Sequence, residues 1–191
     1  MPHPASAPAR DAILAAAQAG DVAALNRLIA DHRQGVYRYG LHVCRTTEDT
    51  EDAVQETLWA ATRAIRTFRG TASAITSWLF TIVRRECMRL IEGNRRRPAP
   101  IEGTDDAQLA DVIDPEDAIA LKRRIEALAG AIADLDPVHR EVVLLRDIQE
   151  LSAPEAAAVL GISIEALKSR LHRARVNLRD DVIQREQRAV R

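Results

Sequence analysis

The sequence predicts an all-α fold of two helical domains joined by a flexible acidic linker, with a helix-turn-helix in the second domain. Three observations carry this prediction. Ala, Leu, Ile and Arg abound while aromatic residues make up only 3%, a bias that favours helices over sheets. Apolar residues recur at helical spacing, and period-two alternation is absent over any useful length. Residues 98–117 interrupt the pattern with prolines, a glycine and acidic residues, a composition typical of a linker.

The first domain is expected at 20–97, after a loose tail and the start of a first helix at 1–19. Its helices are expected at 11–19, 21–44, 47–68 and 77–93. Thr47 or a neighbour in the run TTEDTED serves as the N-cap of the third helix, because acidic residues follow it. The polar loop TASAITS then leads into the fourth helix, which buries Leu79, Phe80, Val83 and Cys87.

The second domain, expected at 118–191, holds predicted helices at 118–134, 137–148, 152–160 and 163–182. The last two form a helix-turn-helix, in which Gly161 allows the positive φ that ends one helix and Ser163 caps the next. The inward stripe of the final helix is Ile164, Leu167, Leu171, Ala174 and Leu178. Its outward residues are Lys168, Ser169, His172 and Arg173, with Arg170 and Arg175 beside them. A cationic helix face fits the major groove of DNA; a solvated basic face is the alternative.

Charge is unevenly distributed, although the formal net charge is only -1. Arginines gather near 84–97 and 168–179, and acidic residues near 48–56 and 102–117. A phosphate backbone senses such local charge rather than the sum. The third helix presents Asp52, Gln55, Glu56 and Trp59 opposite its apolar side, which indicates a protein-docking surface or simple solvation.

The fourth helix carries Arg84, Arg85 and Arg89, close in sequence to the aromatic residues Phe68 and Trp78. Basic helices beside exposed rings suit nucleic acid, including single strands that stack on aromatic side chains. The alternative is a buried aromatic pair with a solvated basic face, and burial is the favoured state of Trp78.

Other classes of function find little support. Two cysteines, Cys44 and Cys87, are too few for a disulfide framework, and we expect buried free thiols in a reducing cytoplasm. No histidine pair has metal-site spacing, so neither metal nor cofactor is expected. The chain shows no nucleophile with a base and no phosphate-cradling loop, which argues against an enzyme. Without a signal peptide or apolar span, we expect a cytoplasmic protein with no direct membrane insertion.

Two long segments resemble a known family. EDTEDAVQETLWAATRAIRTFRG followed by SWLFTIVRRECMRLI resembles region two of bacterial sigma factors, and DPVHREVVLLRDIQELSAPEAAAVLGISIEALKSRLHRAR resembles region four. Their order and lengths are similar to the extracytoplasmic-function (ECF) class. The resemblance implies an initiation factor that binds core RNA polymerase and promoter DNA, both duplex and single-stranded, and that an anti-sigma factor inhibits, in some cases at the inner membrane. A stand-alone helix-turn-helix regulator of duplex DNA is the alternative.

The resemblance also implies roles for residues. Asp52, Gln55, Glu56 and Trp59 would dock on the clamp helices of the β′ subunit. Phe68, Arg69 and Trp78, with Arg84, Arg85 and Arg89, would melt and recognise the minus-ten element. Ser163, Lys168, Ser169, His172 and Arg173 would read the minus-thirty-five element, with Arg170 and Arg175 on phosphates. Leu135, Val142, Val143 and Leu145 are candidates for holding the β flap, with burial as the alternative. The TASAITSW loop has one residue more than is usual in the family, so the preferred base is not implied.

Overall fold

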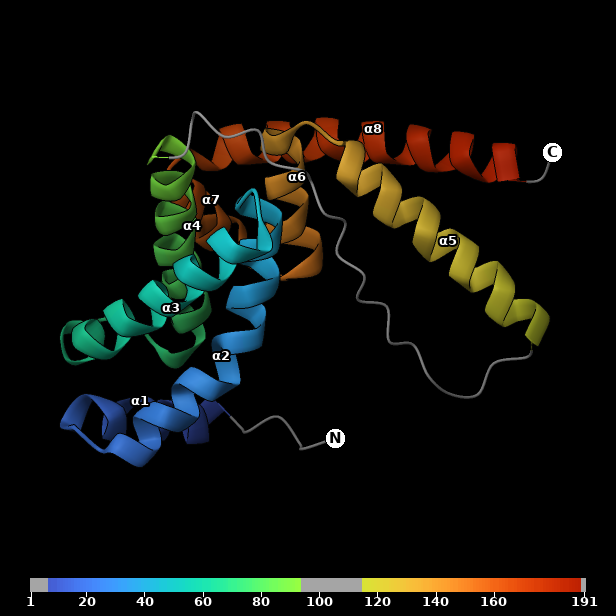
Figure 1. Cartoon of the computed structure of the whole chain (residues 1–191). Coiled ribbons are helices and arrows are strands. Elements are labelled where there is room, and N and C mark those ends of the chain that lie inside the picture. Colours follow the sequence, from blue (N-terminus) through green and yellow to red (C-terminus); the bar gives the residue numbers. More distant parts are fainter. Residues whose placement is uncertain (1–6, 94–114, 190–191) are drawn as a thin grey trace. The chain divides into compact units, whose positions relative to one another are not determined.

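A computed structural model of the chain describes residues 7–93 and 115–189, which divide into two compact units (Figure 1). Within these two ranges every element is helical, as the all-α prediction requires. Most of the expected linker lies outside the described residues. Its last three positions differ from the prediction, because α5 (Pro115–Asp134) begins at 115 rather than 118. A proline is tolerated at the first position of a helix, where its missing N–H has no partner to lose.

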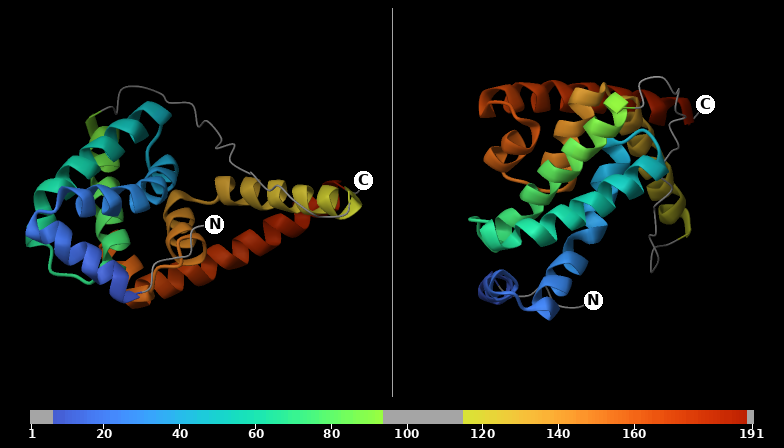
Figure 2. Two further views of the ribbon diagram at one scale, coloured as in Figure 1. Left: turned by 90° about the horizontal axis from the view of Figure 1, so that it is seen from below. Right: turned by 60° about the vertical axis from the view of Figure 1, so that its left-hand side comes forward.

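The first unit is built on α1 (Ala7–Ala19), α2 (Val22–Val43), α3 (Thr47–Ala64) and α4 (Ile75–Gly93), seen from three sides in Figures 1 and 2. Asp21 caps α2, its carboxylate accepting from the backbone N–H of Ala23 at 2.8 Å. In the core, the rings of Tyr39 and Phe80 stack with centroids 4.7 Å apart, and both are fully buried. This pair joins α2 to α4 and contributes roughly 1 kcal/mol beyond its buried area.

The start of α3 is set by Thr46, whose hydroxyl oxygen accepts from the N–H of Asp49 at 3.0 Å, so the N-cap is the neighbour of Thr47 that the sequence allowed. At the end of α2, Cys44 forms a disulfide with Cys87 of α4, with 4.9 Å between their Cα atoms. The expectation of two free thiols is therefore wrong. The pair is 43 residues apart in sequence, and only the packing of α2 against α4 brings the two sulfur atoms together.

The segment between α3 and α4 is held in place by α1. It contains two short 3-10 turns, η1 (Ile65–Thr67) and η2 (Ala72–Ala74), and α4 begins two residues before the predicted Ser77. The Gln18 amide donates to the carbonyl of Phe68 at 2.8 Å, and the N–H of Ala72 donates to the Asp11 carboxylate at 3.1 Å. Asp11 thus caps η2 from a distant part of the chain.

The second unit holds α5, α6 (Pro137–Val143), the part of α7 (Ala153–Leu160) up to Ala157, and α8 (Ile164–Ala189). Arg140 closes the end of α5 by donating to the carbonyls of Ile132 at 3.0 Å and Leu135 at 2.9 Å. The Asp136 carboxylate caps α6, which begins at Pro137, the first residue of the helix predicted at 137–148. The helix expected at 137–148 has the predicted extent but changes character, because Leu144–Ile148 forms a π-helical turn.

The helix-turn-helix follows its predicted plan. Ser152 and Glu155 form a reciprocal capping box at the start of α7, the Glu155 carboxylate accepting from the N–H of Ser152 at 2.9 Å. Gly161 has a φ of +65° in the turn. The Ser163 hydroxyl oxygen accepts from the N–H of Ala166 at 3.1 Å and so caps α8. The inward stripe is buried at Leu167, Leu171, Ala174 and Leu178 and half-buried at Ile164.

α8 is longer than predicted, since it continues beyond residue 182 to Ala189. Arg185 holds this extension: its Nε donates to Asp181 at 2.8 Å on the same helix, and its Nη2 pairs with Asp134 at the end of α5. A guanidinium can bridge two carboxylates because it offers donors in a fixed planar fork. The contact with α5 is a tertiary one, which explains why the helix predicted from local sequence signals ends too early.

Candidate functional surfaces

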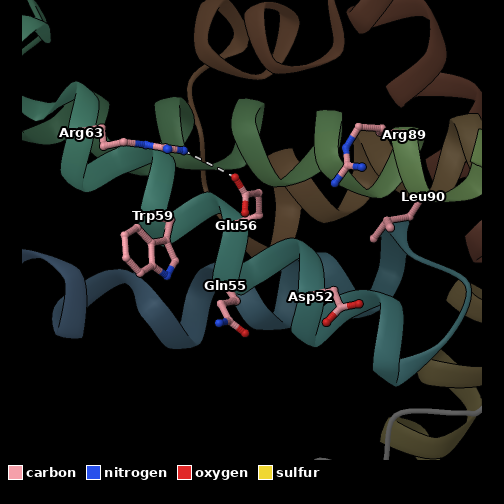
Figure 3. A pocket seen from close by; sticks show the side chains of 7 residues that line it. All are labelled: Asp52, Gln55, Glu56, Trp59, Arg63, Arg89 and Leu90. Atoms are coloured by element: carbon pink, nitrogen blue, oxygen red, sulfur yellow. Dashed lines mark ion pairs between the residues drawn. The ribbon is translucent and has the colours of Figure 1, made fainter.

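An open groove of about 380 Å³ runs along the exposed side of α3 (Figure 3). We call it the α3 groove. Four of its side chains are those predicted for protein docking, and they follow one another along the same helix. α4 supplies the opposite wall. The lining residues are Asp52, Gln55, Glu56, Trp59, Arg63, Arg89 and Leu90.

Trp59 is the most unusual member of the α3 groove. Of the six aromatic residues in the chain, Tyr39 and Phe80 are fully buried and three others are half-buried, whereas Trp59 is 60% exposed. An indole offers a large apolar area with a single N–H donor, and such side chains are enriched where proteins meet. Beside it, Asp52, Gln55 and Glu56 are all exposed.

Glu56 has a partner within the groove. Its carboxylate lies 3.5 Å from Nη2 of Arg63, two helical turns along α3, and the two side chains are 50% and 68% exposed. An ion pair this exposed is worth at most about 1 kcal/mol and is screened by salt. A cationic partner protein can therefore replace Arg63 at little cost. Arg63 was not among the predicted site residues, although its position seven residues after Glu56 places it on the same helix face.

The loop before α4 brings Phe68 and Trp78 together, with ring centroids 4.8 Å apart. Both rings are half-buried, which partly fits the buried-pair alternative and leaves part of each ring accessible. Gly70 permits this arrangement, because a Cβ there would lie 2.4 Å from the tip of the Phe68 ring. Arg69 is exposed beside them.

The basic face of α4 consists of Arg84, which is half-buried, and Arg85 and Arg89, which are exposed. The last two are linked by a residue that the sequence analysis missed. Glu86 is only 8% exposed, and its carboxylate accepts from Nε of Arg89 at 2.8 Å and Nη2 of Arg85 at 3.3 Å. Its position on the apolar stripe of α4, between Val83 and Leu90, is the sequence signal that points to its burial.

The pKa values at this cluster follow from its contacts. Burial alone would raise the pKa of the Glu86 carboxyl, but the hydrogen bonds and positive charges of Arg89 and Arg85 lower it below its ordinary value. In return, the Glu86 carboxylate raises the pKa of the Arg89 guanidinium. Glu86 and Arg89 are therefore both charged at neutral pH.

On α8, the outward residues Lys168, Ser169, His172 and Arg173 are exposed and Arg170 is half-buried. They occupy the first turns of the helix, as a helix that reads DNA with its N-terminal part requires. Ser163 is exposed, and its oxygen already serves as the cap.

Arg175 differs from the other basic residues of α8. Its Nε donates to Asp147 at 3.1 Å, its Nη2 reaches the second carboxylate oxygen, and this pairing raises the pKa of the guanidinium. Asp147 belongs to the π-helical turn after α6. The pair therefore ties the two elements together, and Arg175 holds a structural contact as well as a place near the outward face.

The residues considered for the β flap are all interior. Leu135 is 7% exposed and Val142, Val143 and Leu145 still less, so the burial alternative accounts for them. The exposed large apolar side chains of the second unit are instead Leu128, Val138, Ile148 and Ile183.

The described residues contain neither a candidate metal site nor a candidate membrane span. Among the residues described, no three His, Cys, Asp or Glu side chains gather into a possible metal site. Throughout the described part of the chain, each helix is too short or too polar to span a bilayer.

Comparison with known proteins covers both units. A family model described as Sigma-70 region 2 matches residues 28–97, and one described as Sigma-70, region 4 matches residues 125–178. The ECF RNA polymerase sigma factor SigM of Mycobacterium tuberculosis is 34% identical over 87% of this chain and 81% of its own length. The RNA polymerase sigma factor CnrH of Cupriavidus metallidurans is 34% identical over 88% of this chain and 92% of its own.

Solved structures show the same fold. CnrH in complex with the cytosolic domain of CnrY is 29% identical, covers 90% of this chain and 96% of that one, and superposes with a TM-score of 0.62. The sigma factor RpoE of Bartonella quintana, solved with the anti-sigma factor NepR, is 22% identical with a TM-score of 0.64, covering 82% of this chain and 95% of its own.

Proposed function

Because the chain belongs to the ECF class of RNA polymerase sigma factors, and so is a transcription initiation factor that directs the polymerase to promoters, we propose how its surfaces divide that work. Sigma factors are in general not enzymes, and the proposal concerns binding alone. It assigns polymerase docking to the α3 groove, the minus-ten element to the loop before α4 with the basic face of α4, and the minus-thirty-five element to α8. We place the chain in the cytoplasm, with the polymerase.

The observation that carries the docking assignment is the exposure of Trp59, 60%, in a groove whose other lining residues, apart from Leu90, are polar or charged. A tryptophan that gives up its apolar area on binding can anchor an interface, and the surrounding carboxylates steer a basic partner onto it. We propose that the clamp helices of the polymerase β′ subunit fill the α3 groove, with Asp52 and Glu56 paired to their basic residues.

The test measures assembly of the chain with core polymerase. Asp52→Lys and Glu56→Lys, alone and together, and Trp59→Ala should each weaken assembly, by about tenfold or more for a residue at the centre of the interface. Asp31→Lys is the matched control, since Asp31 is equally exposed on α2 outside the groove. Wild-type assembly by the double variant would refute the docking assignment.

The second assignment concerns α8. Lys168, Ser169, His172 and Arg173 form an exposed outward set on a helix whose inner stripe is buried, which supports insertion of this face into a major groove. Lys168→Ala and Arg173→Ala should each lower promoter-dependent transcription by roughly 10- to 100-fold, the range for a lost base contact. Core binding should stay unchanged. Arg123→Ala, an exposed arginine of α5, is the control, and unaltered promoter activity in both α8 variants would contradict the assignment.

The third assignment concerns promoter melting. Phe68 and Trp78 keep part of their rings accessible, and Arg69, Arg85 and Arg89 are exposed nearby in sequence. Rings and cations of this kind suit an unpaired strand, which gains base stacking on the rings and phosphate contacts. A Trp78→Ala variant should lose open-complex formation on a duplex promoter and recover on a promoter with a pre-melted minus-ten segment. Equal loss on both templates would indicate that Trp78 serves folding alone.

We also propose that an anti-sigma factor holds this chain inactive. The support comes from relatives: CnrH was solved with the cytosolic domain of CnrY, and RpoE with an anti-sigma factor. A purified inhibitor should compete with core polymerase for the chain. Simultaneous binding of both, without loss of affinity for either, would contradict the proposal.

A further inference from the structure

Glu86 lies at an unusual place for a carboxylate. Among residues 8–93 and 121–187, whose side chains the structure describes, it is the only charged side chain that is buried. A buried carboxylate is costly unless it is paired and hydrogen-bonded. Glu86 meets this requirement through Arg89 at 2.8 Å and Arg85 at 3.3 Å, one on each carboxylate oxygen. Burial of this group therefore depends on those two arginines.

The same contacts constrain the arginines. Arg85 and Arg89 are long side chains whose tips would otherwise sample many rotamers. Glu86 engages Nη2 of one and Nε of the other, a small part of the five N–H donors that each guanidinium carries. Both side chains remain largely exposed, at 70% and 65%. They are thus fixed at one edge and still able to donate from the other.

Glu86 also reduces the charge of the basic face of α4. Sequence-independent attraction to DNA grows with the number of phosphates that a protein neutralises, whereas selectivity requires donors at defined positions. A carboxylate between two arginines removes one unit of charge and orders the remaining donors. Both effects favour a defined DNA shape over random DNA.

We propose that Glu86 is a positioning residue that sets the preference of the basic face of α4 for promoter DNA over other DNA. This rests on the proposed function of that face. Glu86 touches no DNA itself and acts through Arg85 and Arg89. The ligand of the two arginines is the sugar-phosphate backbone of the promoter near the minus-ten element.

The experiment compares holoenzymes carrying wild-type, Glu86→Gln or Glu92→Gln chains. Glu92 is exposed on the same helix. Both variants therefore remove one negative charge, but only Glu86→Gln releases Arg85 and Arg89. Affinity is measured over a salt series for a promoter fork and for a scrambled duplex of equal length. Both variants should bind the scrambled duplex more tightly and show a salt slope steeper by roughly 0.7–0.9.

The decisive quantity is the ratio of promoter to scrambled affinity. We expect Glu86→Gln to lower it about tenfold, the effect of losing charge-assisted hydrogen bonds, and Glu92→Gln to leave it unchanged. Arg89→Lys, which keeps the charge and loses the Nε donor, should lower the ratio without altering the salt slope. This second variant keeps the test open if Glu86→Gln does not fold.

Two results would overturn the proposal. Equal ratios for Glu86→Gln and Glu92→Gln would mean that only net charge matters, and equal weakening of both DNAs by Glu86→Gln would mean a purely structural role. Arg85→Ala and Arg89→Ala separate this failure from that of the proposed function. If neither changes DNA binding, the basic face of α4 does not contact DNA; if they weaken promoter binding while the Glu86→Gln ratio holds, only the role of Glu86 is wrong.

Discussion

The disulfide between Cys44 and Cys87 gives a prediction about stability that can be worked out from its place in the chain. It closes a loop over a sequence separation of 43 residues that contains the whole of α3 and most of α4. In the chain-entropy account, a cross-link over a loop of this length restricts the unfolded chain enough to stabilise the folded state by about 4 kcal/mol at 25 °C. A native small domain has only about 5–15 kcal/mol in total, so loss of the bond should be readily measured.

The perturbation is Cys44→Ala with Cys87→Ala, measured against the oxidised wild-type protein, with the reduced wild type as a second comparison. Both cysteines are buried, at 9% and 0% exposure, so alanine leaves small voids but no unpaired polar group. Urea unfolding followed by tryptophan fluorescence should show a loss of about 2–4 kcal/mol in the free energy of unfolding. Reduction of the wild type should reproduce most of it.

The controls decide between the cross-link and local packing. The double alanine variant must be insensitive to reductant, and the unreduced wild type must show no free thiol when titrated under denaturing conditions. If two thiols titrate and reductant leaves the unfolding midpoint unchanged, the protein holds its cysteines reduced and the disulfide does not stabilise the fold.

Three further changes test other contacts. Gly70→Ala should lower the unfolding free energy by about 1–3 kcal/mol, because the new methyl group displaces the Phe68 ring. Gly93→Ala is the control, since the space around Gly93 is open and its stability should not fall; equal thermal midpoints for the two variants would contradict this. Asp11→Ala should lower the unfolding free energy by about 1 kcal/mol because it removes the cap of η2, while Asp11→Asn retains an acceptor and should lower it less. A lower melting temperature for Asp11→Asn than for Asp11→Ala would exclude a capping role for Asp11. The pKa of Glu86 is lowered in the folded state, so the ionised carboxylate stabilises the fold at pH values above its ordinary pKa, and this contribution disappears as pH falls below about 4.5. In urea unfolding, the unfolding free energies of the wild type and of Glu86→Gln should therefore converge in acid; a difference between them that grows as pH falls would contradict this.

Local signals predicted the elements well because they act over a few residues. Gly161 and Ser163 each fix a helix boundary through a turn or a cap, and the structure places both as predicted. The inward stripe of α8 is likewise a matter of helical spacing. The outward positions on α3 and α8 follow from the same spacing, which is why those exposed sets were predictable.

The features that escaped prediction depend on which elements meet. The pairing of Cys44 with Cys87 requires the packing of α2 on α4. The Arg175–Asp147 pair requires the contact of α8 with the turn after α6. Composition favoured free thiols, and the family resemblance implied that Arg175 contacts phosphates. Tertiary contacts supplied Cys87 and Asp147 as partners that neither source specifies.

The division of α8 into two faces has a consequence for redesign. Its orientation is fixed by Ser163 and by the buried stripe that includes Leu167 and Leu171, none of which belongs to the outward set at 168–169 and 172–173. The outward positions can therefore be exchanged as a cassette without disturbing the domain that carries them. Under the assignment of the upstream element proposed for α8, a library at these four positions selected on altered upstream elements should yield promoter–factor pairs that do not cross-react. Assembly with core polymerase, which we propose to occur at the α3 groove, should stay the same.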